Sequence, residues 1–478
     1  MNPAAQSRID LSAFTGTPIA VLGLGKSGLS AARALQEYSA DVRAWDDNPA
    51  RRATAQNHGM PLVDLATADL GDVPTLLLSP GIPHSHPAPH PAVTRARAAG
   101  CEIVCDIELL ARVEHDAIYI GITGTNGKST TTALIGHLLH QLGKRAAIGG
   151  NIGAPALTLA SMGSGGLYVL ELSSYQLELL SSATFDVAIL LNISPDHLDR
   201  HGGMAGYIAA KKRIFARQTA ASFAIVGVDD EASRAIYDSL VAQQQSAIAV
   251  SVERPIAGGV YVVDGWLIDD RDGDARRIID LSDLETLPGP HNAQNAAVAY
   301  TAVSVIIADD ASIDDTALTD AIATFPGLAH RQELVAVVDG SRFINDSKAT
   351  NAAAAARALA CNDNIIWIAG GRAKAGGIEA LAPFFSRIRH AFLIGESAGE
   401  FAKTLDGQVP YTISGELAAA VVGAADLALS GPQPSVVLLS PACASFDQFP
   451  DFEARGEAFR AAVMGLPQTG VAPTEGAA

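Results

Sequence analysis

Short apolar runs rich in β-branched residues alternate along the whole chain with Ala-rich stretches of helical character. Runs such as PIAVLGLG, TLLLSPG, AIYIGITG, NIIWIAGG and SVVLLSPA have the length and composition of buried strands. Strands that alternate with helices pair in parallel and are covered by helices on both faces. We therefore predict an α/β protein whose ligands bind beyond the carboxyl ends of its strands.

The length of 478 residues corresponds to about three domains. We place boundaries where the helical segment DIELLARVEH precedes a strand and where FPGLAHR interrupts the pattern. Asp-Gly pairs in residues 258–279 predict a small antiparallel appendage on the central domain. The predicted organisation is a Rossmann-like domain over 1–110, a central phosphate-loop domain over 111–327, a Rossmann-like domain over 328–465 and a flexible tail over 466–478.

Charge and hydropathy exclude several classes of function. The formal net charge of −18 argues against a nucleic-acid partner, which requires a basic surface. No run reaches the roughly 20 apolar residues of a membrane span, and the N-terminal segment lacks the apolar core of a signal peptide. We therefore expect a soluble, cytoplasmic protein. Four cysteines do not make a disulfide framework, and Cys101 and Cys105 are expected to be packing thiols.

The first glycine-rich loop has the pattern Gly23-x-Gly25-x-x-Gly28 between a predicted strand and a predicted helix. An acid, Asp46, ends the next strand. This is the fingerprint of a turn that presents a helix N-terminus to a diphosphate. The pattern alone does not distinguish a dinucleotide cofactor from another nucleotide diphosphate.

A second loop, GITGTNGKST, follows the strand at Ile120 and opens another helix. Its backbone N–H groups point at an anion, Lys128 can neutralise phosphate charge, and the Ser129 hydroxyl can bind Mg²⁺. The spacing of Gly121 departs by one place from the strict phosphate-loop motif, and Gly124 supplies the flexibility inside the loop. The sequence therefore predicts an ATP site here.

Three residues further along are candidate magnesium ligands. Glu171 ends a strand, and His197 follows another, although a helix-capping acid and a structural histidine are alternative interpretations. Lys211 falls on the apolar arc of the helix GYIAAKKRIFARQ, whereas Lys212 points away. A buried cation is costly, so Lys211 either pairs with Glu171 or reacts with CO₂ to form a carbamate, an oxygen ligand suited to Mg²⁺.

Polar loops also mark the last part of the chain. Asn292 and Asn295 share one face of a predicted helix and could contact an adenine edge, or Asn292 could cap that helix. Beyond them, the segments AHRQE, NDSKATN, GGRAK and SPACASFDQF place cations and hydroxyls near strand ends. Together they favour a small anionic substrate.

In their order along nearly the whole chain, TGTNGKST, ELSSYQLE, DHLDR, AAKKRI, HNAQNA, GLAHR, NDSKATN and SPACASFDQF resemble the Mur ligases. These are the ATP-dependent amino-acid ligases of peptidoglycan precursor synthesis. The motifs ELSSYQLE, NDSKATN and SPACASFDQF are most similar to those of the D-glutamate-adding members. The resemblance implies that a UDP-N-acetylmuramoyl-L-alanine carboxylate is phosphorylated by ATP and then joined to the D-glutamate amine through a tetrahedral intermediate.

The resemblance also implies a role for each matching residue. The ATP-binding set is Gly124, Thr125, Asn126, Gly127, Lys128, Ser129, Thr130, Asn292, Asn295, Arg331 and Asp346. Two magnesium ions would be held by Ser129, Glu171, His197 and Lys211 as its carbamate. The catalytic set is Lys128, Glu171, His197, Lys211, His330 and Lys348.

The two substrates have sets of their own. The UDP-substrate set is Gly25, Lys26, Ser27, Asp46, Asp47, Ser79, Gly81, Asn151 and Ser173. The D-glutamate set is Thr350, Lys374, Ser445 and Phe452. Arg372 departs from the acid that some members carry in this segment, which puts an acidic partner of Lys374 in doubt. We expect a monomer.

Other functions remain open on the sequence alone. A Mur ligase of different amino-acid specificity and a folylpolyglutamate-synthase-like enzyme share the central motifs, although the latter lacks an N-terminal domain of this kind. An NAD(P)-dependent oxidoreductase could use the loop at Gly23. A catalytically idle nucleotide-sugar-binding protein is disfavoured by the intact set of Lys128, Glu171, His197 and Lys211.

Overall fold

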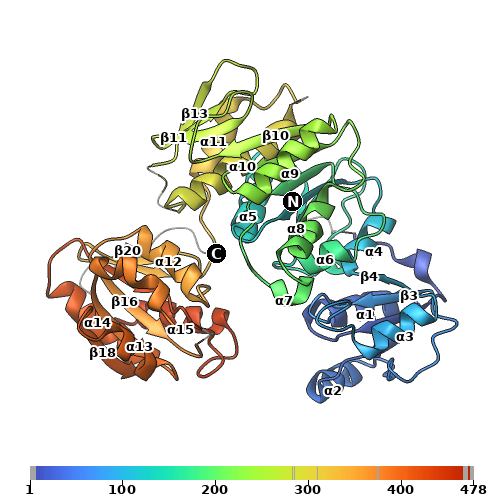
Figure 1. Cartoon of the computed structure of the whole chain (residues 1–478), viewed down its shortest axis with the longest axis horizontal. Coiled ribbons are helices and arrows are strands. Elements are labelled where there is room, and N and C mark those ends of the chain that lie inside the picture. Colours follow the sequence, from blue (N-terminus) through green and yellow to red (C-terminus); the bar gives the residue numbers. More distant parts are fainter. Residues whose placement is uncertain are drawn as a thin grey trace. The chain divides into compact units, whose positions relative to one another are not determined.

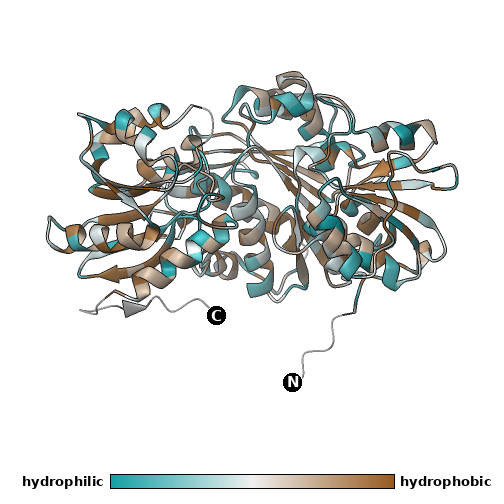
Figure 2. Cartoon of the chain, turned by 90° about the horizontal axis from the view of Figure 1, so that it is seen from below, coloured by the Kyte–Doolittle hydropathy of each residue, from teal (hydrophilic) through white to brown (hydrophobic). Residues whose placement is uncertain are grey.

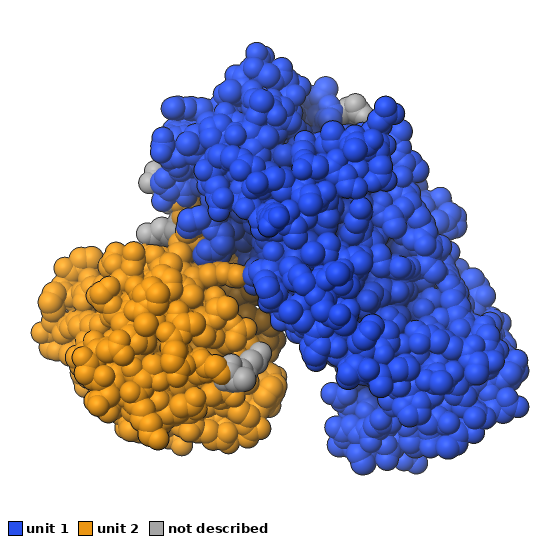
Figure 3. Space-filling view, viewed as in Figure 1, with its two compact units in different colours: residues 1–283, 290–325 blue, residues 284–289, 326–478 orange. Residues whose placement is uncertain are grey.

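A computed structural model describes residues 7–282, 284, 286–308, 310–373, 376–466 and 472–473. The chain divides into two compact units, one formed by residues 1–283 and 290–325 and the other by 284–289 and 326–478 (Figure 3). The described strands form three sheets, two in the first unit and one in the second (Figure 1). The predicted α/β class is confirmed. In Figure 2 most of the strands are brown, the colour of hydrophobic residues, and lie between helices.

The N-terminal sheet of the first unit is entirely parallel, in the order β2-β1-β3-β4. Its two inner strands, β1 and β3, are almost completely buried, as expected for strands covered on both faces. The strands are β1 (Pro18–Leu22), β2 (Asp41–Trp45), β3 (Thr75–Leu78) and β4 (Glu102–Val104), and the helices are α1 (Lys26–Glu37), α2 (Pro49–Asn57), α3 (Pro91–Ala98) and α4 (Asp106–Val113).

The turn between β1 and α1 requires its glycines. Gly23 has a φ of +94°, and a Cβ on Gly28 would lie 1.8 Å from the Gly23 carbonyl oxygen. The Ser79 hydroxyl donates to that same carbonyl at 2.9 Å, which ties the turn to the end of β3. The helix can therefore start this close to the strand only without a side chain at residue 28.

The second sheet of this unit has the order β13-β12-β11-β10-β9-β8-β5-β7-β6. Its first two pairings are antiparallel, which confirms the predicted appendage and shows that it extends the edge of the large sheet. The strands are β5 (Ile118–Thr123), β6 (Ala146–Gly150), β7 (Leu167–Glu171), β8 (Val187–Leu190), β9 (Phe223–Gly227), β10 (Ser246–Ser251), β11 (Val260–Val263), β12 (Trp266–Asp269) and β13 (Arg276–Asp280).

Three strands of the second sheet, β5, β7 and β8, end at the same edge, and helices follow them there. Ile122 of β5 stands opposite Glu171 of β7, and Thr123 stands opposite Leu190 of β8, so three parallel strands end side by side. The helices of this region are α5 (Lys128–Gln141), α6 (Ser174–Glu178), α7 (Leu198–His201), α8 (Met204–Lys212), α9 (Glu231–Ala242), α10 (Pro290–Ile307) and α11 (Asp315–Ala323).

The second unit holds one mixed sheet in the order β18-β17-β16-β19-β15-β14-β20. Its strands are β14 (Glu333–Val338), β15 (Ser341–Asn345), β16 (Ile365–Gly370), β17 (Ile388–Ile394), β18 (Tyr411–Gly415), β19 (Val436–Leu439) and β20 (Ala472–Pro473), and its helices are α12 (Ala352–Ala360), α13 (Ala398–Leu405), α14 (Leu417–Leu429) and α15 (Phe452–Met464). Within the predicted tail, β20 pairs with β14, and residues 467–471 and 474–478 lie outside the described residues.

The predicted domain boundaries compare with the structure as follows. The boundary after residue 110 falls inside α4. Near the second boundary, residues 284–289 group with the second unit although residues 290–325 belong to the first. The chain therefore contributes to the second unit once before α10 and α11 and again after them.

The Gly28→Ala substitution tests the β1–α1 turn. We expect a loss of about 1–3 kcal/mol in the free energy of unfolding, because the added methyl group overlaps the fixed Gly23 carbonyl. Urea denaturation followed by circular dichroism measures this loss. Gly399→Ala is the control, since its methyl group would meet nothing within 4 Å. Equal stability of the two variants would contradict this account of the turn.

Candidate active site

A cavity of about 300 Å³ lies in the first unit, at the carboxyl ends of β5 and β7. It brings together six residues that the sequence analysis assigned to a site, namely Gly81, Lys128, Asn151, Ser173, His197 and Lys211. Its other lining residues are Pro80, Ser174, Tyr175, Asp196 and Tyr207, none of which the sequence analysis selected. Gly81 follows a strand of the N-terminal sheet, so the cavity has one wall from each sheet of this unit.

The phosphate loop is held in a fixed shape. Gly127 adopts a φ of +84° at the start of α5, and the Asn126 N–H donates to Oδ1 of Asn192 at 2.9 Å. The Lys128 ammonium donates to the carbonyl oxygens of Gly124 and Thr125, at 2.9 Å each. Thr125 is bound through its hydroxyl to the Ser194 carbonyl oxygen. The loop therefore has the preorganised backbone of an anion site.

Lys211 is buried, with 1% of its surface exposed, as its position on the apolar arc of α8 predicts. Its ammonium donates to the Gly124 carbonyl oxygen at 2.7 Å and lies 4.7 Å from the centre of the Tyr207 ring. Among the residues that the structure describes, no carboxylate lies within ion-pair distance of this ammonium, so the alternative of a Glu171 ion pair is not observed. Burial and then the charge of Lys128 lower the pKa of Lys211 well below its usual value.

Glu171 has the chemistry of a metal ligand. It is buried at the end of β7, and its Oε1 accepts a hydrogen bond from Nδ2 of Asn151 at 2.8 Å. Its other carboxylate oxygen, Oε2, is buried and accepts no hydrogen bond. Such an orphaned oxygen fits a bound cation. The described residues contain no group of three or more His, Cys, Asp or Glu side chains arranged for a metal.

His197 is displayed at the cavity by an unusual backbone conformation. It has a φ of +51° immediately before α7, and its ring lies 5.4 Å from that of Tyr175. Burial lowers the pKa of His197, and the charges of Lys128 and Lys211 act in the same direction, although Asp196 opposes them. The lowered pKa favours the neutral imidazole, which is the form that binds metals.

Asn292 and Asn295 lie behind the phosphate loop. Both are buried, and Nδ2 of Asn295 donates to Oδ1 of Asn292 at 3.1 Å. Oδ1 of Asn295 accepts from the Thr131 hydroxyl at 3.1 Å, and a Cβ at Gly127 would lie 2.3 Å from it. Asn295 therefore leaves no room for a side chain at residue 127 of the loop. Ser129 is buried and Thr130 is half-buried in the first turn of α5.

Several of the predicted UDP-substrate residues lie at or near the β1–α1 turn, whereas Asn151 and Ser173 follow strands of the large sheet. Asp46 is buried, and its carboxylate accepts from the backbone N–H groups of Leu24 at 2.7 Å and Asn48 at 2.8 Å. Asp47 bonds to His90 at 2.9 Å, while Gly25 and Ser27 are half-buried at the start of α1. The Lys26 ammonium donates to the Gly153 carbonyl oxygen at 2.9 Å, which links the N-terminal sheet to the large one.

In the second unit, Asp346 directly follows β15, and His330 lies shortly before its paired strand β14. The Asp346 carboxylate accepts from the Ser440 hydroxyl at 2.8 Å, and burial raises the pKa of Asp346 to about 7 against the opposing charges of Arg331 and Arg357. Nδ1 of His330 lies 3.0 Å from the Asn345 amide nitrogen. A Cβ at Gly456 would lie 2.1 Å from the same imidazole nitrogen, so α15 packs tightly on the ring.

Three of the four predicted D-glutamate residues are described in the second unit. The Lys348 ammonium lies 3.6 Å from the centre of the Phe452 ring, and Phe452 begins α15. Thr350 is half-buried and Ser445 is buried, while Lys374 lies outside the described residues. Arg372 pairs with Glu396, with two nitrogen–oxygen distances of 3.1 Å.

Sequence reasoning missed Arg455, which is fully buried in the same unit. Its guanidinium donates to the Ser347 hydroxyl at 3.0 Å and to the Ser347 and Cys443 carbonyl oxygens at 2.8 and 3.1 Å. It thereby joins the segments that carry Lys348 and Ser445. Nothing in the local sequence pattern signals this role, because its partners are mostly backbone atoms of distant loops.

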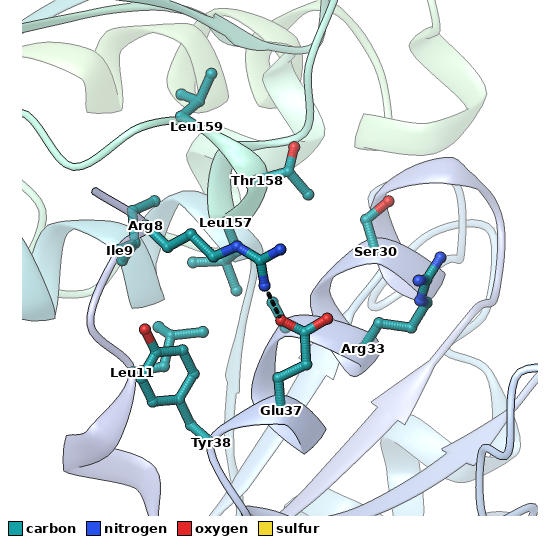
Figure 4. A pocket seen from close by; sticks show the side chains of 11 residues that line it. Arg8, Ile9, Leu11, Ser30, Arg33, Glu37, Tyr38, Leu157, Thr158 and Leu159 are labelled. Carbon is teal, nitrogen blue, oxygen red and sulfur yellow. Dashed lines mark hydrogen bonds and ion pairs between the residues drawn. The ribbon is translucent and has the colours of Figure 1, made fainter. Parts of the chain in front are cut away.

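A second cavity of about 280 Å³ lies between the N-terminal segment, α1 and the short helix Ala156–Thr158 (Figure 4). Arg8 and Glu37 form an ion pair of 2.6 Å, and the apolar lining of the cavity includes Leu157 and Leu159. None of the predicted site residues lines this cavity.

Models of known families match the first unit. Residues 17–105 match the N-terminal domain of MurD-like Mur ligases, and residues 122–303 match the Mur ligase middle domain. No helix among the described residues is long and apolar enough to cross a bilayer.

Full-length relatives are highly similar to this chain. The UDP-N-acetylmuramoylalanine–D-glutamate ligase of Rhodospirillum rubrum is 50% identical over 475 residues, which cover 98% of each chain. The ligase of the same name from Caulobacter vibrioides is 51% identical over 473 residues, which cover 97% of this chain and 98% of the relative.

Solved structures of lower identity share the fold. UDP-N-acetylmuramate-alanine ligase from Thermotoga maritima superposes with a TM-score of 0.57 at 18% identity, covering 94% of this chain and 99% of that one. A pseudomurein peptide ligase type C from Methanothermus fervidus gives a TM-score of 0.55 at 17% identity, with coverage of 94% and 100%. With a phosphate loop, a cation-lined cavity and full-length relatives at half identity, the chain belongs to the Mur ligase family.

Proposed function

We propose that this protein is an ATP-dependent ligase that adds D-glutamate to UDP-N-acetylmuramoyl-L-alanine in cytoplasmic peptidoglycan precursor synthesis. The observation that carries the proposal is the single cavity in which Lys128 and Lys211 meet Gly81 from the N-terminal sheet. The first unit has a glycine-rich turn of the kind that binds a nucleotide diphosphate and a phosphate loop of the kind that binds ATP. A substrate with a diphosphate at one end and a carboxylate to be phosphorylated at the other matches this pair of loops. The full-length relatives support this choice of substrates.

The proposed ATP site is the phosphate loop. Residues 124–130 would cradle the phosphates with backbone N–H groups, and Lys128 would leave its loop carbonyls to neutralise the β- and γ-phosphates. Asn292 and Asn295 would contact the adenine end. Arg331 and Asp346 are the proposed contributions of the second unit to nucleotide binding.

The proposed metal content is two magnesium ions, held by residues of the first unit. The orphaned Oε2 of Glu171, the Ser129 hydroxyl and the His197 imidazole are donors of the kinds that Mg²⁺ sites use or tolerate. When bound, the magnesium ions would offset the negative charge that gathers between ATP and the substrate carboxylate.

Lys211 would supply the remaining ligand as its carbamate. An amine that is buried without a carboxylate partner is destabilised as a cation, and its neutral form can attack CO₂. The nitrogen–carbon bond forms, a proton is released, and a cation becomes a carboxylate-like anion. This change removes an unpaired buried cation beside Lys128 and creates an oxygen ligand near Glu171.

The chemistry then proceeds in two steps. The substrate carboxylate attacks the γ-phosphorus in line, the bond to the bridging oxygen of ADP breaks, and an acyl phosphate forms. The D-glutamate amine attacks the acyl carbon, loses a proton, and inorganic phosphate leaves as the amide forms. Lys128 would hold the transferring phosphoryl group.

Each substrate has a proposed set of binding residues. For the UDP end, Gly25, Lys26 and Ser27 would face the diphosphate at the N-terminus of α1, and Asp46 and Asp47 would face the uridine. Ser79, Gly81, Asn151 and Ser173 would contact the remainder of that substrate. For D-glutamate, the proposed set is Thr350, Lys374, Ser445 and Phe452, with His330 and Lys348 lining the reaction centre. The proposed oligomeric state is a monomer.

An amino-acid panel tests the substrate assignment. With UDP-N-acetylmuramoyl-L-alanine and ATP, we expect phosphate release to be at least about 100-fold faster with D-glutamate than with L-alanine, L-lysine or diaminopimelate, because a site built for one set of polar groups rejects ligands that leave them unpaired. Initial rates of phosphate release provide the measurement. Comparable turnover with another amino acid of the panel would reject D-glutamate as the substrate.

The Lys211→Ala substitution tests the carbamate. We expect kcat to fall by about 10²–10³-fold, as when one electrostatic stabiliser of a transition state is removed, with partial recovery in formate or acetate. Independently of activity, the wild-type protein in ¹³C-bicarbonate should give a carbamate carbon resonance that Lys211→Ala lacks. Lys212→Ala is the matched control, since Lys212 is exposed and bonds to Ser239. An active Lys211→Ala variant, or a spectrum without the resonance in the wild type, would rule out the carbamate.

A further inference from the structure

Ser174, His201 and Glu178 form a hydrogen-bonded chain beside the proposed active site. The Ser174 hydroxyl lies 2.9 Å from Nε2 of His201, and Nδ1 of the same ring lies 3.2 Å from Oε1 of Glu178. Ser174 and Glu178 are the first and last residues of α6, whereas His201 ends α7. Only Ser174 lines the cavity, so the histidine and the acid stand behind it.

His201, the middle residue of this hydrogen-bonded chain, is rigidly held. Its side chain has no exposed surface, and its ring stacks on that of Tyr175 at 5.3 Å with an interplanar angle of 12°. The Tyr207 ring lies 5.3 Å away from it on another side. The second oxygen of Glu178 lies 3.6 Å from Nε2 of His84, which belongs to the loop after β3.

These contacts determine how the Ser174 hydroxyl is oriented. A carboxylate can only accept hydrogen bonds, so Glu178 fixes the proton of a neutral His201 on Nδ1. Nε2 is then an acceptor, and the Ser174 hydroxyl must donate its hydrogen to it. The Ser174 oxygen can then accept a hydrogen bond from a group in the cavity that this residue lines, but its hydroxyl hydrogen is not free to be donated there.

We infer that Ser174 is a specificity-determining residue that accepts a hydrogen bond from the alanyl amide N–H of the acyl substrate, and that His201 and Glu178 are positioning residues for it. This inference rests on the proposed function. An acceptor repels the substrate carboxylate, which Lys128 attracts in the same cavity. The alanyl amide N–H is the nearest donor to that carboxylate along the substrate.

The test replaces the amide of the substrate by an ester, so that L-lactate stands in place of L-alanine and only the N–H is lost. For the wild-type protein we expect the KM of the ester to exceed that of the amide by about tenfold, the value of one hydrogen bond of about 1.4 kcal/mol. In Ser174→Ala, the amide KM should rise by about tenfold and the ratio of the two KM values should fall to near one. The values of kcat and of KM for ATP and D-glutamate should stay within about twofold.

His201→Phe should lower the same ratio, because the hydroxyl of Ser174 is then free to rotate and donate. His115→Gln, at an exposed histidine before β5, is the control and should keep the wild-type ratio. Circular dichroism spectra and melting temperatures identify any variant that fails to fold, and Ser174→Ala, the smaller change, then decides. An unchanged ratio in Ser174→Ala, or equal KM values for both substrates in the wild type, would overturn the inference. Absence of turnover of the amide by the wild-type protein would instead reject the proposed function.

Discussion

The parallel register of β5, β7 and β8 is the constraint on which the first unit depends. It ends three strands at one edge and places the phosphate loop beside Glu171. Lys211 enters this edge from α8 and donates to the Gly124 carbonyl oxygen, so that a cation without a carboxylate partner lies beside Lys128. Burying such a charge is costly, and a fold does not retain that arrangement for stability alone. The unpaired cation and the orphaned oxygen of Glu171 are both explained by a site that is completed by ligands.

The two glycine-rich loops of the first unit have related shapes and separate tasks in this account. The turn at Gly23 brings α1 close to β1, and the Asp46 carboxylate fixes that turn through the Leu24 N–H. Such a turn suits any nucleotide diphosphate, so the pattern by itself does not imply a dinucleotide cofactor. In the proposed function this turn binds the nucleotide end of the substrate, and the loop at Gly124 binds the ATP that activates its far end. Gly81 and Lys128 line the same cavity, which is consistent with one substrate extending from one loop to the other.

The sequence predicted features that depend on local pattern. The strand–helix alternation, the antiparallel appendage and the inward aim of Lys211 follow from periodicity and turn residues, and the structure has all three. It did not predict contacts between residues far apart in the chain, such as the bond from Ser174 to His201 or the buried Arg455. Local patterns carry no information on such pairings, because they are determined by how α6, α7 and the loops of the second unit pack. Local pattern suggested roles for residues such as Lys128 and Lys211, the family resemblance supplied the others, and all of these roles stay predictions.

The central claim is that the carboxylate of the UDP substrate accepts the γ-phosphoryl group of ATP. Labelling that carboxylate with ¹⁸O and analysing the inorganic phosphate by mass spectrometry tests it most directly. The account predicts that each turnover with D-glutamate transfers one ¹⁸O atom from the substrate to the phosphate, because the acyl carbon–oxygen bond breaks when the amide forms. Phosphate that contains no label, released alongside the expected amide product, would contradict it.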